Sequence, residues 1–342
     1  TREGLYYSTY PNFVHWKTGR IHSSHNQCAT NTRRASSSVP NIQQVSKNEK
    51  VEGFSPKVRE LFIPHKKNAV IVSMDFMAQE LRVIASYSRD NGMLSCYLGD
   101  SLRDMHAMTG LGIFNARNNL QWTYEEFTAA LHDKEHLMYA EVKKARALGK
   151  QTNFTTEFGA AAPKLAQTIM VTEGDAQVYI DAKEKAFPDV VLWKEVVIAE
   201  AKNKGYVTTM LGARRHLREF LNSDDRFARS KAERQSVNFK VQSSSAEMTK
   251  LAEGRMFDAA LEQKFDCQII AAIHDEVLAS VSLDCIFEFI PEMHKCMVTS
   301  YADMYVPVMS SISFGKSFGP ADQIEIGEAP TKDAIEKGLS QL

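Results

Sequence analysis

The chain has 342 residues, 44% of them hydrophobic and 24% charged, and its formal net charge is −1. These values are typical of one large or two ordinary globular domains, and they exclude a low-complexity chain or one that is basic throughout. The N-terminus lacks the apolar core of a signal peptide, and no run approaches membrane-spanning length. Five cysteines without a CxxC pair predict reduced thiols in a cytoplasmic-type compartment.

In chain order, the first distinctive segment is residues 26–57, which is rich in Asn, Gln, Ser and Thr and predicts a loop or linker. Its long polar side chains also suit contacts with the phosphates and groove edges of a nucleic acid. These side chains are Arg33, Arg34, Asn41, Gln43 and Gln44. A plain surface loop and a nucleic-acid contact both remain open for this segment.

The next segment, residues 58–86, predicts a strand, a turn and a helix. The apolar run from Val70 to Met74 forms the strand, Asp75 ends it, and the helix carries Glu80 near its start. A carboxylate at the end of a buried strand is rigidly held, which suits a metal ligand. Asp is also common as the N-cap of a following helix, so both interpretations of Asp75 stand.

Residues 123–201 are largely helical and begin with a capping-box pattern, Thr123-Tyr-Glu-Glu126. In a continuous helix, four later residues share one face because they recur every four positions. They are Arg146, Lys150, Phe154 and Phe158. Cations beside rings suit a face that binds a triphosphate and stacks on a base, although Arg and Lys stems lying over an apolar stripe give the same pattern.

A helix over residues 190–204 is predicted to end at Gly205, and a hairpin follows over residues 206–215. A polar helix over residues 230–242 carries one stripe that faces either a partner or solvent, made of Arg234, Asn238 and Gln242. A separate helix is expected over residues 244–265.

The stretch Gln268–Val281 predicts a buried hairpin whose exposed tip carries His274, Asp275 and Glu276. Asp75 and Asp275 would then end neighbouring strands and suit two divalent cations, the arrangement of two-metal phosphoryl and nucleotidyl transfer. A helix over residues 286–304, a strand over residues 307–313 and a Gly- and charge-rich tail complete the chain.

Five ordered segments within residues 17–315 resemble family A DNA polymerases of the Klenow type. They are KTGRIHSSHNQ…TRRASSSVPNIQQV, VIVSMDFMAQELRVIASYSRD (motif A), RALGKQTNFTTEFG (motif B), AERQSVNFKVQSSSAEM and IIAAIHDEVLASV (motif C). The resemblance implies an α+β fold, with a palm made of an antiparallel sheet and packed helices and a mostly helical fingers subdomain. It implies a DNA-directed DNA polymerase in the cytoplasm of a bacterium or a phage-infected host, and the divergence from the family pattern favours a phage or plasmid source.

The resemblance also implies the order of the subdomains. They are the end of the thumb and the approach to the palm (1–25), palm with motif A (26–109), fingers (110–210), palm with motif C (211–315) and a C-terminal tail (316–342). Only the last residues of a thumb fit before the first segment, and a 3′–5′ exonuclease domain has no room. We therefore expect either a piece of a longer polymerase or the product of a split gene.

Each residue that matches a family motif takes an implied role. Asp75 and Asp275 match the metal-binding aspartates, with the Phe76 backbone carbonyl as a further ligand and Glu276 as a secondary acid. Glu80 matches the glutamate that excludes a ribose 2′-hydroxyl. The nucleotide-binding positions are Glu80, His106, Arg146, Lys150, Phe154 and Phe158, and Lys150 is also a catalytic proton donor. The DNA-binding positions are Arg34, Asn41, Gln43, Arg234, Asn238, Gln242 and His274.

The implied reaction is template-directed addition of deoxynucleotides to a primer 3′ end. Its cofactors are two Mg²⁺ ions, for which Mn²⁺ is a substitute, and its partners are primer-template DNA and dNTPs, without a membrane. Phe158 departs from the Tyr usual in the family, and Thr155 from its Gly, but no metal ligand or triphosphate cation is lost.

Three alternatives remain. The chain is a subunit that is weak or inactive without a separate thumb or exonuclease chain or a processivity factor, a metal-dependent nuclease, or an RNA-synthesising relative. Glu80 and the face of Arg146, Lys150 and Phe154 disfavour the nuclease, and Glu80 disfavours the RNA-synthesising relative.

Overall fold

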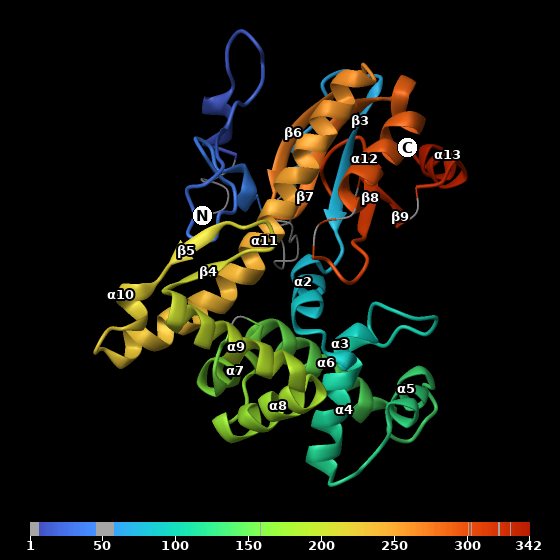
Figure 1. The fold of residues 1–342 in the computed structure, drawn as a ribbon. Coiled ribbons are helices and arrows are strands. Elements are labelled where there is room, and N and C mark those ends of the chain that lie inside the picture. Colours follow the sequence, from blue (N-terminus) through green and yellow to red (C-terminus); the bar gives the residue numbers. More distant parts are fainter. Residues whose placement is uncertain are drawn as a thin grey trace. The chain divides into compact units, whose positions relative to one another are not determined.

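The structure is a computed structural model that describes residues 7–45, 58–157, 159–299, 301, 303–320, 322–328 and 330–342. The described residues form two compact units (Figure 1). The unit that we call the sheet unit takes its residues from 1–80, 242–302 and 307–342, and the helical unit takes its residues from 81–241 and 303–306.

The strands are β1 (Ser24–Asn26), β2 (Ser36–Ser38), β3 (Ala69–Phe76), β4 (Tyr206–Thr208), β5 (Arg214–His216), β6 (Cys267–Ile273), β7 (Glu276–Ser282), β8 (Ser310–Gly315) and β9 (Gln323–Gly327). The α-helices are α2 (Gln79–Ser88), α3 (Asn91–Leu94), α4 (Met105–Asn118), α5 (Tyr124–His132), α6 (Tyr139–Thr156), α7 (Ala162–Ile169), α8 (Glu173–Ala186), α9 (Pro188–Lys204), α10 (Arg218–Leu221), α11 (Arg226–Glu262), α12 (Ile286–Val298) and α13 (Lys332–Leu339). Short 3₁₀ helices are η1 (Tyr10–Phe13), η2 (Ile42–Gln44), η3 (Val58–Leu61) and η4 (Leu283–Cys285).

The sheet unit is organised around a five-stranded antiparallel sheet of order β6-β7-β3-β8-β9. Because successive side chains of a strand point to opposite faces, β3 contributes side chains to both faces of the sheet. Val70, Val72 and Met74 enter a core with residues of α11, α12 and α13, whereas Ile71 joins a smaller cluster with Ile42 on the opposite face. Helices α12 and α13 lie beside the sheet in Figure 1. Together with the helical unit, this arrangement confirms the expected α+β class.

The helical unit holds α4 and α6 in close contact through two glycines. A Cβ added to Gly149 would lie 2.5 Å from the His106 carbonyl oxygen and 2.7 Å from the Gly110 amide nitrogen, and one added to Gly110 would lie 2.8 Å from the Arg146 Cα. Any larger residue at either position would push the two helices apart. Because Gly110 and Gly149 have no side chains, α4 and α6 lie close together, and this sets the spacing between His106 on α4 and the predicted cationic stripe on α6.

Several local predictions are confirmed. Thr123 and Glu126 form the expected capping box of α5. Gly205, with φ of 78°, ends α9, and the hairpin β4–β5 follows it. All five cysteines are free thiols.

In the part of the chain that the structure describes, none of the helices is long and apolar enough to cross a membrane.

The structure differs from the sequence predictions in three places. One continuous helix, α11, replaces the two separate helices expected on either side of residue 243. Serines 243–245, at the junction of the two expected helices, are buried in α11, and Ser243 Oγ donates to the Thr32 carbonyl at 2.8 Å. Helix α12 ends at Val298 and strand β8 begins at Ser310, each several residues from the predicted position.

The third difference concerns the expected C-terminal tail, residues 316–342. This segment contains β9, which forms the edge of the sheet, and α13, whose Ile335 is fully buried in the main core. Few apolar residues are scattered among Gly and charged ones in this segment. The hydrophobic pattern was therefore too sparse to predict a strand and a helix that depend on an existing core.

Candidate functional site

The end of β3 carries Asp75, and strand register decides which residues surround it. Asp75 pairs with Glu276 of β7 and with Ser311 of β8, and residues paired across antiparallel strands share one face of the sheet. Asp75 is the last residue but one of β3, and helix α2 begins only at Gln79. The interpretation of Asp75 as a helix N-cap is therefore wrong.

The turn between β6 and β7 consists of His274 and Asp275. His274 is exposed and has a positive φ of 63°, a conformation found at tight hairpin turns. The Phe76 amide donates to the Asp275 carbonyl at 3.3 Å. This bond ties the turn to the end of β3, so the backbones of the two predicted metal-binding aspartates lie side by side.

Glu276 is not part of the exposed tip, as the sequence suggested, but begins β7 and is buried. Its carboxylate accepts a hydrogen bond from Ser73 Oγ, and one of its oxygens lies 4.0 Å from the guanidinium of Arg59. Arg59 in turn lies 4.2 Å from the ring of Phe318 and donates to the Val45 carbonyl at 3.1 Å. Glu276 therefore belongs to a buried polar cluster that also includes Ser73 and Arg59.

The candidate ligands for a metal ion at this end of the sheet are the Asp75 and Asp275 carboxylates and the neighbouring backbone carbonyls. Within the described residues, no group of three or more His, Cys, Asp or Glu side chains is arranged to hold a metal ion. Mg²⁺ is commonly held by only one or two protein carboxylates, with water and substrate phosphates as its other ligands. Two carboxylates and a carbonyl oxygen are therefore compatible with Mg²⁺.

The predicted DNA-binding residues of the N-terminal segment have defined partners in the sheet unit. Arg34 forms an ion pair with Glu80, the predicted sugar-selecting residue. Asn41 caps η2, because its Oδ1 accepts from the Gln43 amide at 3.1 Å. The side-chain amide of Gln43 donates to the Ala272 carbonyl at 3.0 Å, which holds this segment against β6.

In the helical unit, Arg146 is fixed by the residue that caps the neighbouring helix. Its Nη2 and Nε lie 2.6 and 2.7 Å from Asp104 Oδ2, while Asp104 Oδ1 accepts from the amides of His106 and Ala107 at 2.8 and 3.2 Å. Burial opposes ionisation of Asp104, but hydrogen bonds from Arg146 and the amides outweigh it and lower the pKa of this carboxyl. Asp104 is therefore ionised at neutral pH and holds the Arg146 side chain.

The remaining members of the stripe gather around the His106 ring. The rings of His106 and Phe154 are 5.5 Å apart between centroids, and Lys150 Nζ is 5.9 Å from the Phe154 ring. Phe154 is 61% exposed. Burial lowers the pKa of His106, and the positive charges of Arg146 and Lys150 add to this effect against the opposing Asp104. This face thus presents two cations, a neutral imidazole and an exposed ring; Phe158 lies outside the described residues.

The polar stripe of α11 has the predicted helical spacing. Arg234 is exposed and donates to Ser230 Oγ at 2.6 Å, whereas Asn238 and Gln242 are half-buried. Residues up to 241 of this helix belong to the helical unit, and residues from 242 onward belong to the sheet unit. The stripe is therefore divided between the two units.

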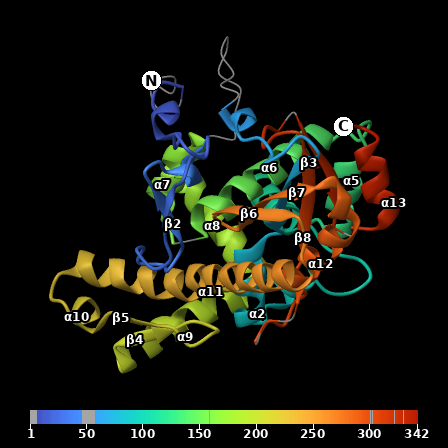
Figure 2. The same cartoon turned by 90° about the horizontal axis from the view of Figure 1, so that it is seen from above.

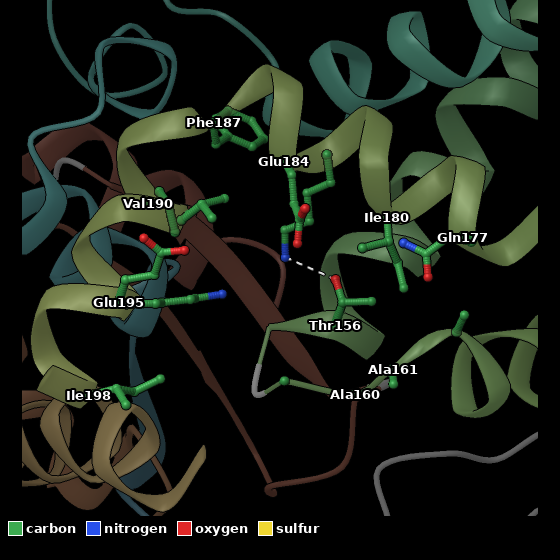
Figure 3. A pocket seen from close by; sticks show the side chains of 15 residues that line it. Thr156, Ala160, Ala161, Gln177, Ile180, Glu184, Phe187, Val190, Glu195 and Ile198 are labelled. Atoms are coloured by element: carbon green, nitrogen blue, oxygen red, sulfur yellow. Dashed lines mark hydrogen bonds between the residues drawn. The ribbon is translucent and has the colours of Figure 1, made fainter. Parts of the chain in front are cut away.

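A cavity of about 400 Å³ in the helical unit was not predicted from the sequence (Figure 3). It is lined mainly by α8, α9 and the residues around the end of α6. In its wall, Lys183 Nζ donates to Thr156 Oγ1 at 3.1 Å and lies 3.3 Å from Glu157 Oε2. Burial lowers the pKa of Lys194, which lines the same cavity. No motif reveals this cavity, because packing between separate helices creates it.

The chain is similar to known proteins in fold and in sequence. A structure described as the POL domain of Pol1 from M. smegmatis, in complex with DNA primer-template and dNTP, has a TM-score of 0.75 and 27% identity, covering 93% of this chain and 50% of that one. DNA polymerase I of Geobacillus stearothermophilus is 28% identical over 308 residues, which are 89% of this chain and 32% of that protein. The thermostable DNA polymerase I of Thermus aquaticus is 26% identical over 316 residues, 92% of this chain and 34% of the relative.

The structural match shows that the fold resembles that of a polymerase domain. The model of the family described as DNA polymerase family A matches residues 2–320, and the chain therefore belongs to this family. It spans about a third of the length of these curated relatives. Strand β9 and helix α13 follow the matched residues.

Proposed function

We propose that this chain catalyses template-directed addition of deoxynucleotides to a primer 3′ end by two-metal-ion nucleotidyl transfer. The observation that carries the proposal is the backbone bond from Phe76 to Asp275, which ties the turn that carries Asp275 to the residue that follows Asp75 at one end of the sheet. Membership of DNA polymerase family A supports it, as does a structural neighbour that is a complex with DNA primer-template and dNTP.

Asp75 and Asp275 hold two Mg²⁺ ions in this proposal, with the Phe76 carbonyl as a further ligand and Mn²⁺ as a substitute. When bound, the ions lower the pKa of the primer 3′-hydroxyl and neutralise charge on the triphosphate. Glu276 supports the site as a secondary acid, because its contact with Ser73 anchors the first residue of β7 to β3.

The helical unit supplies the nucleotide-binding residues. Arg146, oriented by Asp104, and Lys150 bind the triphosphate, and Lys150 donates a proton to the leaving pyrophosphate. His106 is neutral and donates a hydrogen bond to a phosphate oxygen, while the exposed ring of Phe154 stacks on the sugar and base.

The sheet unit and helix α11 supply the remaining specificity. Glu80 occupies the space of a ribose 2′-hydroxyl and so selects deoxynucleotides. The DNA is contacted by Arg34, Asn41, Gln43, Arg234, Asn238, Gln242 and His274.

Primer extension on a templated hairpin with Mg²⁺, with dNTPs and rNTPs in parallel reactions, tests the proposal. Wild-type protein should extend the primer with dNTPs, and Asp75→Ala or Asp275→Ala should abolish extension. Asp284→Asn is the matched control, because this exposed carboxylate lies just beyond the opposite end of β7. Full synthesis by either alanine variant would exclude the metal assignment.

The same assay separates the alternatives. A polymerase subunit that is weak alone extends the primer only when a separate thumb or exonuclease chain is added. A nuclease shortens the primer without adding nucleotides. An RNA-synthesising relative extends it with rNTPs at least as well as with dNTPs.

A further inference from the structure

The loop between β1 and β2 is fastened to the middle of α11 inside the sheet unit (Figure 2). Lys250 Nζ donates to the carbonyls of both Gln27 and Arg33, the latter at 2.6 Å. One ammonium group therefore joins the two ends of this loop. Lys250 is half-buried, so these bonds are partly shielded from competing water.

Two more residues of α11 reach the same loop. Ser243 Oγ donates to the Thr32 carbonyl at 2.8 Å, and Glu247 Oε1 lies 3.7 Å from Arg33 Nε. Together with Lys250, these residues are spaced four and then three apart, so they form one stripe along the helix. We call Ser243, Glu247 and Lys250 the tether.

The tether holds the loop in a conformation that the chain does not favour. Arg33 has a positive φ of 57°, a left-handed conformation that is unfavourable for a non-glycine residue. Its amide donates to the Thr30 carbonyl at 3.0 Å, and Thr30 Oγ1 donates to the Arg34 carbonyl at 2.9 Å. The backbone immediately around Arg34 is therefore fixed on both sides.

The side chain of Arg34, which projects from this fixed backbone, binds Glu80. The side chains of Arg34 and Glu80 are 37% and 23% exposed, and the two form an ion pair. A glutamate at the start of a helix has several accessible rotamers, and a guanidinium held in place restricts them. Selection against a single hydroxyl group requires the carboxylate to be held within about 0.5 Å.

We propose that the tether, and Lys250 in particular, positions Arg34 against Glu80 and thereby sets how strongly the protein discriminates against ribonucleotides. The inference rests on the proposed function and adds a specificity-determining residue to it. Lys250 acts through the loop and Arg34, so it is a positioning residue with no contact to the nucleotide.

The test is the ratio of kcat/KM for a dNTP to kcat/KM for the matching rNTP in primer extension. Lys250→Met should lower this ratio about fivefold, in the range of coupling between residues of one hydrogen-bonded network. Lys250→Arg should keep most of the ratio, because it can donate to both carbonyls. Lys231→Met, at an exposed position of the same helix, is the matched control and should leave the ratio unchanged. A general loss of activity would lower both kcat/KM values equally.

A second pair of variants shows whether the effect passes through Glu80. In a Glu80→Gln background, adding Lys250→Met should not lower the ratio further, because the ion pair is already lost. Ser243→Ala provides a smaller disruption of the same loop and should shift the ratio in the same direction. Thermal unfolding of each variant identifies any that fail to fold, and Ser243→Ala then replaces Lys250→Met in the double variant.

The outcomes are distinct. An unchanged ratio in a folded Lys250→Met protein that still synthesises DNA overturns this inference and leaves the proposed function intact. The same loss in the Glu80→Gln background shows that Lys250 acts by another route, which also overturns it. Absence of any dNTP addition by the wild type overturns the proposed function and the inference together.

Discussion

The two units hold their functional groups by different means. In the sheet unit, Asp75 and Asp275 are placed by strand register and by a backbone hydrogen bond that no side-chain substitution removes directly. In the helical unit, the Asp104 side chain orients Arg146, and Asn153 Nδ2 lies 3.2 Å from His106 Nδ1. The close crossing of α4 and α6 keeps these residues together. The positions of the acids are therefore robust to side-chain changes, whereas the cationic face of α6 depends on neighbouring side chains.

Removing an acid from the end of the sheet should stop the reaction and spare the fold. Asp275→Ala should lower kcat at least about 10³-fold, because the loss of a metal ligand removes several kcal/mol of transition-state stabilisation. The free energy of unfolding should change by less than about 1 kcal/mol, since the carbonyl of residue 275 still accepts from Phe76. Single-turnover extension and urea unfolding measure the two quantities. A large loss of stability would show that the side chain, rather than the backbone, maintains the turn.

Replacing Glu276, unlike replacing its neighbour Asp275, should lower the stability of the fold. Glu276→Ala leaves the Arg59 guanidinium without its carboxylate in a buried cluster and should cost about 3 kcal/mol of unfolding free energy. Glu276→Gln retains an acceptor for Ser73 Oγ and should cost less. Urea unfolding of both variants checks this order, and equal costs would contradict the buried-pair explanation.

The glycine contact tests the helical unit. Gly149→Ala should cost about 2 kcal/mol, because its Cβ would meet backbone atoms of α4 at 2.5 and 2.7 Å. Gly254→Ala in α11 is the matched control, since its Cβ meets nothing within 4 Å, and it should stabilise the protein by up to about 1 kcal/mol. Thermal unfolding compares the two. Activity of Gly149→Ala should also fall, because α6 carries Arg146 and Lys150 away from His106.

The smallest expected effect is that of Asp104→Asn. Asn still caps α4 but loses the charge that holds Arg146, so the variant should lose about 0.5 kcal/mol at neutral pH because the pair is partly exposed. The pKa of Asp104 is lowered from 3.8 on folding, so the unfolded chain takes up this proton first as the pH falls. The stability that it contributes is therefore present above pH 3.8 and lost below it. Urea unfolding as a function of pH should show a shallower acid decline for Asp104→Asn than for the wild type.

Local patterns were sufficient for much of the fold and for the acidic end of the site. The apolar run of β3, the capping box at Thr123 and the glycine after α9 each depend on a few adjacent residues, and the structure confirms them. The stripe of Arg146, Lys150 and Phe154 follows from helical spacing alone. The order of the five motifs was enough to indicate the family, because each motif is a short contiguous stretch of residues.

The long-range arrangement could not be obtained in this way. The inward turn of Glu276 depends on Ser73, 203 positions away, and the ion pair of Arg34 depends on Glu80, 46 positions away. Ser243, buried within α11, has the Thr32 carbonyl as its partner, 211 positions away. Hydrophobic periodicity reports which face of an element is buried, but not which polar group lies opposite it. The residue types of the candidate site could therefore be predicted from local sequence. The partners that orient its side chains are decided only by the tertiary structure, because they come from distant segments that pack together.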